Sequence, residues 1–158
     1  TAAAGDVAPT LLDRLLRPGR ESGRDVVIAR WGSYHGNSLG ALDLSGREPL
    51  RRPYAPWLGR FRHVSTPYPY RAGQETAHAL ADPAALAAEL EGAIVAAGER
   101  RVAAFVAEPI VGATLGAVAP PDGYWPAIAD VCARHGVLLV ADEVQAVTSL
   151  VITDAPNS

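Results

Sequence analysis

The chain has 158 residues, 49% hydrophobic and 20% charged, which is typical of one globular domain and excludes a disordered chain. Its net charge of −3, with no basic run longer than the pairs 51–52 and 100–101, excludes a general nucleic-acid-binding protein. No apolar run approaches the ~20 residues that span a bilayer. The one cysteine, Cys132, excludes an internal disulfide and favours a reducing compartment. We therefore expect a cytoplasmic protein that binds neither nucleic acid nor membrane.

The first half of the chain contains one clear strand. Residues 25–31 (DVVIARW) combine β-branched residues without polar alternation, which predicts a strand buried on both faces. A short helix is expected over 37–44, after the turn-forming Gly36. Residues 45–74 show no clear period and contain five prolines, so we expect a long structured excursion that serves function or wraps a partner.

A helix is expected to begin at Pro83 and to end near Gly98. Asp82 is a suitable N-cap, and proline is favoured at the first helical position. Apolar residues at four-residue spacing predict the buried stripe of this helix: Leu86, Leu90 and Ile94.

The second half then alternates strand and helix. Residues 102–107 (VAAFVA) and 137–141 (VLLVA) predict buried strands, and 123–135 predicts an amphipathic helix between them. This alternation predicts an α/β fold with a mostly parallel sheet and flanking helices.

Polar residues follow each of the three predicted strands. Residues 34–36 (YHG) follow the first strand, Glu108 follows the second, and Asp142 and Glu143 follow the third. Ligands of open parallel sheets bind at the carboxyl ends of the strands. The sequence therefore predicts a binding site where these residues converge.

An apolar strand that ends in acid has two functional interpretations. The first is the magnesium-binding strand of a nucleotide hydrolase, but its phosphate loop requires a lysine and all fourteen basic residues here are arginine. The second is a carboxylate that keeps a pyridine ring nitrogen protonated, as pyridoxal phosphate requires. Asp142 would be that carboxylate, and Tyr34 and Val144 are candidates for the two faces of the ring.

Three segments resemble the class III, fold-type I aminotransferases, which depend on pyridoxal 5'-phosphate (PLP). They are SYHGNSLGALDLSG (33–46), VAEPIVGATLGAVAPPDGYW (106–125) and HGVLLVADEVQ (135–145). The resemblance implies that residues 25–145 are part of the large PLP-binding domain. It also implies transfer of an amino group from an amino acid or amine to a 2-oxo acid by a homodimer. The similarity of residues 33–46 and 113–124 to the family favours an ω-amino acid or amine as donor and pyruvate as acceptor.

The resemblance also implies roles for individual residues. Tyr34 matches the aromatic residue that stacks on the cofactor ring, while His35 and Gly36 shape its turn. Asp142 matches the partner of the pyridine nitrogen, and Val144 matches the residue on the opposite ring face. For His35, the residue type alone favours a hydrogen-bond partner within the turn over an acid or base.

Two further positions match the family pattern. Gln145 matches a residue near the phenolic oxygen of the cofactor, and Glu108 matches a glutamate that governs substrate entry. Glu108 could instead cap a neighbouring helix or loop. Glu143 is expected to be structural, because successive side chains of an extended strand point in opposite directions.

The sequence departs from the family pattern at both ends. Residues 1–24 contain no recognisable phosphate-binding turn, and residues 146–158 match no family segment. The lysine that forms the Schiff base is absent. We therefore expect an incomplete, truncated or frame-shifted chain that is inactive on its own. The alternative is a non-catalytic pseudoenzyme or assembly fragment of the same fold.

Overall fold

A five-stranded sheet forms the centre of the computed structural model, which describes residues 23–72, 79–112, 114–143 and 152–153. The strand order is β2-β1-β5-β6-β7; the first four strands are parallel and β7 is antiparallel to β6. The strands are β1 (Val26–Arg30), β2 (Arg62–Val64), β5 (Val102–Ala107), β6 (Leu138–Ala141) and β7 (Ile152–Thr153).

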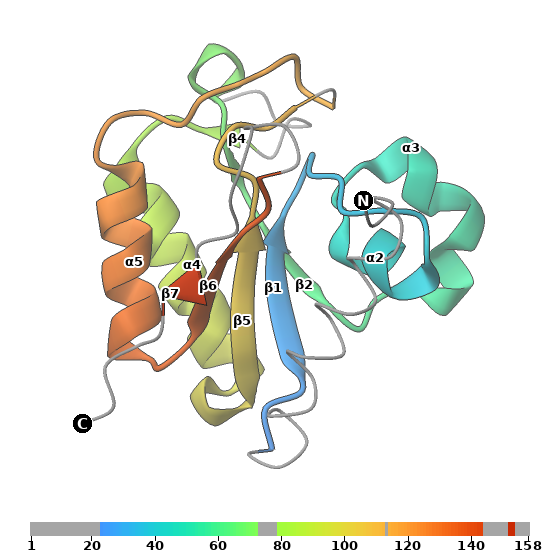
Figure 1. Ribbon diagram of the computed structural model, residues 1–158, viewed down its shortest axis with the longest axis horizontal. Helices are drawn as coiled ribbons and strands as arrows, with labels where there is room; N and C mark the ends of the chain where they lie inside the picture. Colours follow the sequence, from blue (N-terminus) through green and yellow to red (C-terminus); the bar gives the residue numbers. More distant parts are fainter. Residues whose placement is uncertain (1–22, 73–78, 113, 144–151, 154–158) are drawn as a thin grey trace.

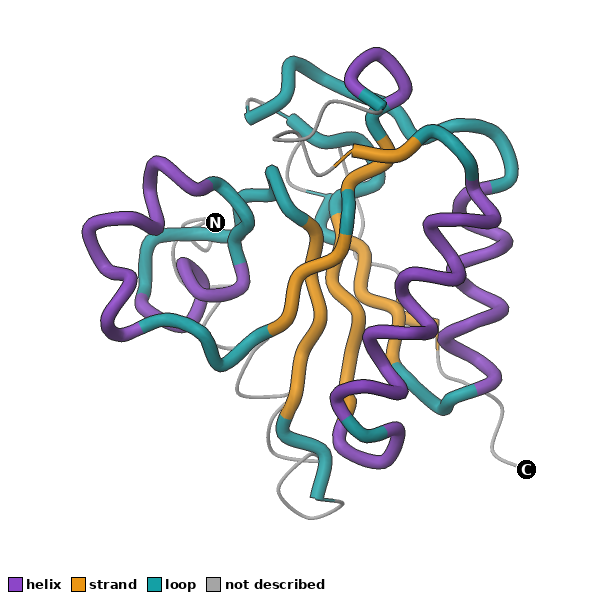
Figure 2. The backbone as a smooth tube through the Cα atoms, turned by 180° about the vertical axis from the view of Figure 1, so that it is seen from behind, coloured by secondary structure: helices purple, strands orange, loops and turns teal. Residues whose placement is uncertain are grey.

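Helices cover both faces of this sheet (Figures 1 and 2). One face carries α4 (Pro83–Ala97) and α5 (Tyr124–Arg134), and the other carries α2 (Leu39–Leu44), α3 (Glu48–Arg51) and the 3₁₀ helix η1 (Arg52–Trp57). The remaining short elements are β3 (Thr66–Pro67), η2 (Pro69–Arg71), β4 (Ala79–Leu80) and η3 (Glu99–Arg101); β3 and β4 pair in parallel. In the described ranges, no helix is long and apolar enough to cross a membrane.

Strand β1 is buried on both faces, as its continuous apolar pattern predicts. Val26 and Ile28 pack in the cluster that contains the apolar residues of α4 and α5. Val27 and Ala29 pack on the other face, in a cluster with Leu44 at the end of α2. The alternation follows from the two-residue period of a strand.

The predicted helix that starts at Pro83 is confirmed as α4. The Asp82 carboxylate accepts a hydrogen bond from the Ala84 N–H at 3.0 Å, which satisfies one of the free donors of the first turn. The predicted stripe is buried, with exposed fractions of 2%, 0% and 0% for Leu86, Leu90 and Ile94. The strands predicted over 102–107 and 137–141 and the helix over 123–135 are confirmed within one or two residues.

Residues 45–74 contain regular elements that the sequence did not predict, including strand β2 at the edge of the sheet. β2 has only three residues, of which Arg62 is exposed, His63 half-buried and Val64 buried. A three-residue edge strand is too short to show a hydrophobic period, so it could not be predicted from the residue pattern.

The Asp43 carboxylate holds this excursion against α2. It accepts hydrogen bonds from the main-chain N–H groups of Gly59 (2.8 Å), Arg60 (2.8 Å) and Phe61 (3.2 Å). The Arg51 guanidinium contacts the same carboxylate at 3.3 Å. Asp43 is 4% exposed, so these donors replace the water that the buried charge loses.

Candidate functional site

Residues from three strands meet at the carboxyl edge of the sheet. Residues 34–36 follow β1, Glu108 follows β5 and Asp142 follows β6. The Tyr34 main-chain N–H donates to Glu108 Oε1 at 3.4 Å, and His35 contacts Asp142. The main chain of Tyr34 and the side chains of His35, Glu108 and Asp142 therefore lie in one cluster.

The His35 ring fixes the Asp142 carboxylate. Its Nδ1 lies 2.7 Å from Asp142 Oδ2, and because a carboxylate only accepts, Nδ1 carries the proton of this hydrogen bond. His35 is itself held by its main-chain N–H, which donates to Ser45 Oγ at 2.8 Å. The Asp142 N–H donates to the Ala107 carbonyl at 2.9 Å, which continues the pairing of β5 with β6. The histidine thus acts as a hydrogen-bond partner that sets the direction of a carboxylate.

The Tyr34 side chain is 37% exposed although its main chain is anchored at Glu108. An accessible aromatic ring on an anchored main chain is available to stack on a planar ligand. Gly36 has a φ of 126°, in the region that favours glycine, and turns the chain away directly after His35.

A close packing of main chain supports this turn. The Gly46 N–H donates to the Ser33 carbonyl at 3.0 Å, and Ser33 Oγ donates to the Arg30 carbonyl at 2.7 Å. A Cβ at Gly46 would lie 2.2 Å from the Arg30 carbonyl oxygen, a distance no side chain can accept. Residue 46 must therefore be glycine for the turn to sit where it presents Tyr34 and His35.

Glu108 is 5% exposed and lies among charged groups. Burial raises the pKa of the Glu108 carboxyl above its usual value, and the Asp142 charge acts in the same direction. Charge interactions with His35 and Arg30 oppose that rise in pKa, as does the hydrogen bond from the Tyr34 N–H. The protonation state of this carboxyl therefore depends on its immediate neighbours.

Sequence reasoning missed Arg30, the last residue of β1. Its side chain is 0% exposed, and its Nη2 donates to the Glu108 main-chain carbonyl. The guanidinium carbon lies 5.9 Å from the centre of the Tyr124 ring and 5.8 Å from that of Trp125. The available signal was a charged residue within an apolar run, directly before the turn.

Two of the predicted site residues, Val144 and Gln145, lie outside the described residues. The described residues contain no group of three or more His, Cys, Asp or Glu side chains that could hold a metal ion. A carboxylate held by the imidazole of His35, with the accessible residue Tyr34 directly before that histidine, does fit a pyridine ring with a protonated nitrogen.

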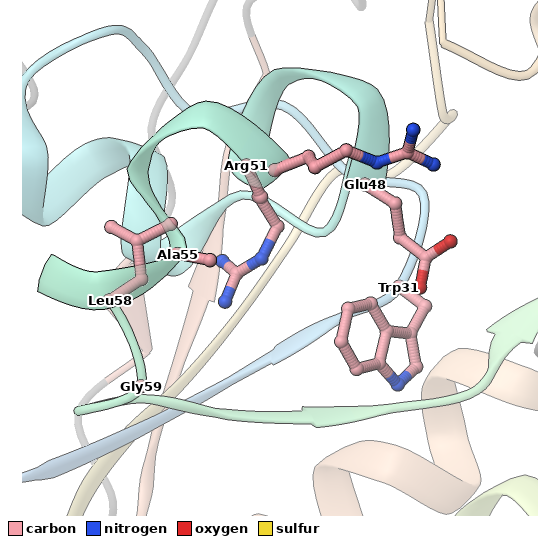
Figure 3. A pocket seen from close by; sticks show the side chains of 7 residues that line it. Trp31, Glu48, Arg51, Ala55, Leu58 and Gly59 are labelled. Atoms are coloured by element: carbon pink, nitrogen blue, oxygen red, sulfur yellow. The ribbon is translucent and has the colours of Figure 1, made fainter.

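A pocket of about 380 Å³ lies away from this cluster, on the α3 and η1 side (Figure 3). It is lined by Trp31, Glu48, Arg51, Arg52, Ala55, Leu58 and Gly59. Arg51 Nη1 already donates to the carbonyls of Leu42, Asp43 and Ser45, and its guanidinium lies 5.8 Å from the centre of the Trp31 ring. One charged group of the pocket, the Arg51 guanidinium, therefore already holds the fold together.

The sequence model of the aminotransferase class-III family matches residues 5–149. Over 125 residues the chain is 40% identical to the uncharacterized aminotransferase YodT of Bacillus subtilis, covering 79% of this chain and 28% of YodT. Over 121 residues it is 39% identical to the putrescine–pyruvate aminotransferase of Pseudomonas aeruginosa, and the match covers 77% of this chain and 26% of that protein. The chain thus spans about a quarter of the length of these relatives.

Solved transaminase structures share the fold. A thermostable (S)-enantioselective omega-transaminase from Thermomicrobium roseum matches with a TM-score of 0.79 and 37% identity, covering 91% of this chain and 32% of that one. The expected fold class, part of a fold-type I α/β domain, is confirmed by this match. The chain belongs to the class-III aminotransferase family.

Proposed function

We propose that this chain is part of a PLP-dependent aminotransferase that moves an amino group from an amino acid or amine to a 2-oxo acid. The observation that carries the proposal is the Asp142 carboxylate, fixed by His35 at the carboxyl edge of the sheet beside Tyr34. When bound, PLP supplies an electron sink that stabilises negative charge on the substrate carbon.

Asp142 would receive the hydrogen bond of the protonated pyridine nitrogen, an interaction worth ~1.5–3 kcal/mol. Because His35 already holds Oδ2, the carboxylate need not be ordered when the ring binds. Tyr34 would stack on the ring, which adds ~0.5–1.5 kcal/mol beyond the burial of its surface. The Asp142 side chain is 19% exposed, so part of the carboxylate is accessible to a ligand.

The remaining family positions extend this proposal. Val144 would cover the opposite ring face, Gln145 would lie near the phenolic oxygen, and Glu108 would act on substrate entry. The lysine and the phosphate-binding turn that the chemistry requires would belong to parts of the protein beyond these 158 residues. The relatives named for putrescine–pyruvate and omega-amino transfer favour an amine donor with pyruvate as acceptor. A cytoplasmic homodimer is part of the same proposal.

Pyridoxamine 5'-phosphate tests the ring site, because it carries the pyridine ring but needs no lysine to bind. We would titrate it into the chain and follow the ligand absorbance and the amide NMR shifts of Tyr34, His35 and Asp142. Saturable binding with shifts at these three amides is expected. Asp142→Asn should weaken binding by about ten- to a hundredfold, the effect of ~1.5–3 kcal/mol, and Tyr34→Ala should weaken it about tenfold, the effect of ~1.4 kcal/mol.

Tyr70→Ala is the matched control, because Tyr70 is 89% exposed and lies in η2. It should leave the affinity unchanged. Equal losses in Tyr34→Ala and Tyr70→Ala, or shifts confined to other residues, would contradict the proposed site. Absence of any saturable binding would contradict a ring site formed by these 158 residues.

A further inference from the structure

Arg30 is a buried cation within a strand that is otherwise apolar. Removing a guanidinium from water costs free energy, which only good partners offset. Within the described residues, Nη2 donates to the Glu108 carbonyl, whereas Nε and Nη1 have no hydrogen-bond partner. The guanidinium also lies over the Tyr124 and Trp125 rings and interacts with the Tyr124 hydroxyl. These contacts favour a cation at this position, and the hydrogen bond to the Glu108 carbonyl joins that cation to the candidate site.

The charge of Arg30 acts on the Glu108 carboxyl. Glu108 Oε1 accepts the Tyr34 N–H, and Oε2 has no hydrogen-bond partner among the described residues. The other ionisable groups that act on Glu108 are His35, which favours the carboxylate, and Asp142, which opposes it. Arg30 is the member of this cluster that stays charged at every working pH.

We propose that Arg30 is a positioning residue of the ring site: its guanidinium anchors the main chain of Glu108, and its positive charge favours the form of the Glu108 side chain that accepts the Tyr34 main-chain N–H. This inference rests on the proposed cofactor function, because Tyr34 is the residue whose ring would stack on the pyridine.

The physical link between Arg30 and the ring runs through one hydrogen bond. An ionised Glu108 has only acceptor sites, so either oxygen can receive the Tyr34 N–H. A protonated Glu108 is the weaker acceptor and adds an O–H donor that needs a partner of its own. Loss of the Arg30 charge would thus loosen the main chain of Tyr34 without touching its side chain.

The test compares Arg30→Met, which keeps the apolar stem, with Arg30→Lys, which keeps the charge. The Glu108 carboxyl would be titrated by ¹³C NMR in the 158-residue chain, with Glu108→Gln to assign the signal. The Tyr34 amide shift should follow the same midpoint as Glu108. In Arg30→Met we expect the midpoint to rise by about one pH unit, and pyridoxamine 5'-phosphate to bind about fivefold more weakly.

Arg30→Lys should bring both the Glu108 midpoint and the affinity for pyridoxamine 5'-phosphate most of the way back to those of the parent chain. An Arg30→Met chain that is folded, with an unchanged Glu108 midpoint, would overturn the inference and leave Arg30 a structural residue. A shifted midpoint with unchanged ligand affinity would also overturn it, because the link to the ring would be missing. If the parent chain does not bind the ligand, the proposed function fails, while the midpoints still decide whether Arg30 controls Glu108.

Discussion

Gly46→Ala tests how the fold presents the candidate site. The new Cβ would lie 2.2 Å from the Arg30 carbonyl oxygen, 2.5 Å from Trp31 Cα and 2.7 Å from Gly32 N. All three atoms belong to the main chain, so no side-chain rotation can relieve the contacts. The φ of Gly46 lies outside the left-handed region, so the effect is steric and not conformational.

The expected cost follows from these contacts. Overpacking of a tight site costs ~1–3 kcal/mol. Displacing the turn also weakens the bifurcated hydrogen bond from the Gly46 N–H to the Ser33 carbonyl and hydroxyl oxygens, worth ~1 kcal/mol. We therefore expect the free energy of unfolding to fall by about 3 kcal/mol. Pyridoxamine 5'-phosphate should also bind more weakly, because the turn carries Tyr34 and His35.

Urea unfolding followed by tryptophan fluorescence measures this change, with Gly92→Ala as the matched control. Gly92 is exposed within α4, and a Cβ there would meet nothing within 4 Å. The same substitution at Gly92 should stabilise the chain by ~0.5–1 kcal/mol, since alanine favours a helix over glycine. The packing argument expects the free energy of unfolding of Gly46→Ala to be ~3 kcal/mol lower than that of the parent chain. A difference smaller than about 0.5 kcal/mol would refute this argument.

Three other predictions concern buried polar groups. Asp43→Asn should lower the free energy of unfolding by ~2–4 kcal/mol, because an amide cannot accept hydrogen bonds from all of the donors that the carboxylate binds. Asp130→Asn, at an exposed site, is the control. An equal loss of stability in Asp130→Asn would contradict this account. Burial, together with a nearby arginine, lowers the pKa of His63 to about 4. Because the unfolded chain takes up this proton at higher pH than the folded chain, the free energy of unfolding should fall as the pH drops from 6.5 towards 4. A His63 titration midpoint above about 6, measured by NMR in the folded chain, would be inconsistent with this burial. Burial raises the pKa of the Cys132 thiol to about 12. Ellman's reagent at pH 8 should therefore label this thiol only as the chain unfolds. Labelling at the rate of a free thiol would show that the face of α5 carrying Cys132 is exposed to solvent.

The long periodic elements were predictable because a single signal defines each one. α4 has its cap at Asp82 and its apolar stripe, and β1 and β5 are continuous apolar runs. The convergence of residues 34–36, Glu108 and Asp142 followed from the rule that parallel strands end at one edge of the sheet. Their roles towards a cofactor remain predictions.

The features that were not predicted depend on contacts between distant residues. Asp43 reads as an ordinary polar residue of a short helix, and only the fold brings the N–H groups of 59–61 to its carboxylate. Arg30 was assigned to a strand, since nothing local shows that its guanidinium reaches the carbonyl of Glu108, 78 positions away. The need for glycine at position 46 likewise arises from the main chain of residues 30–32.

The protonation state of a bound pyridine nitrogen tests the central claim most directly. Pyridoxamine 5'-phosphate labelled with ¹⁵N in the ring would be added to the chain, and the ¹⁵N shift would be measured above the pH at which the free ligand loses its ring proton. A shift of the protonated ring in the parent chain, lost in Asp142→Asn, is the result that a ring held by Asp142 predicts. A neutral-ring shift in the bound state, or the same shift in both chains, would contradict the assignment of this edge of the sheet as the cofactor site.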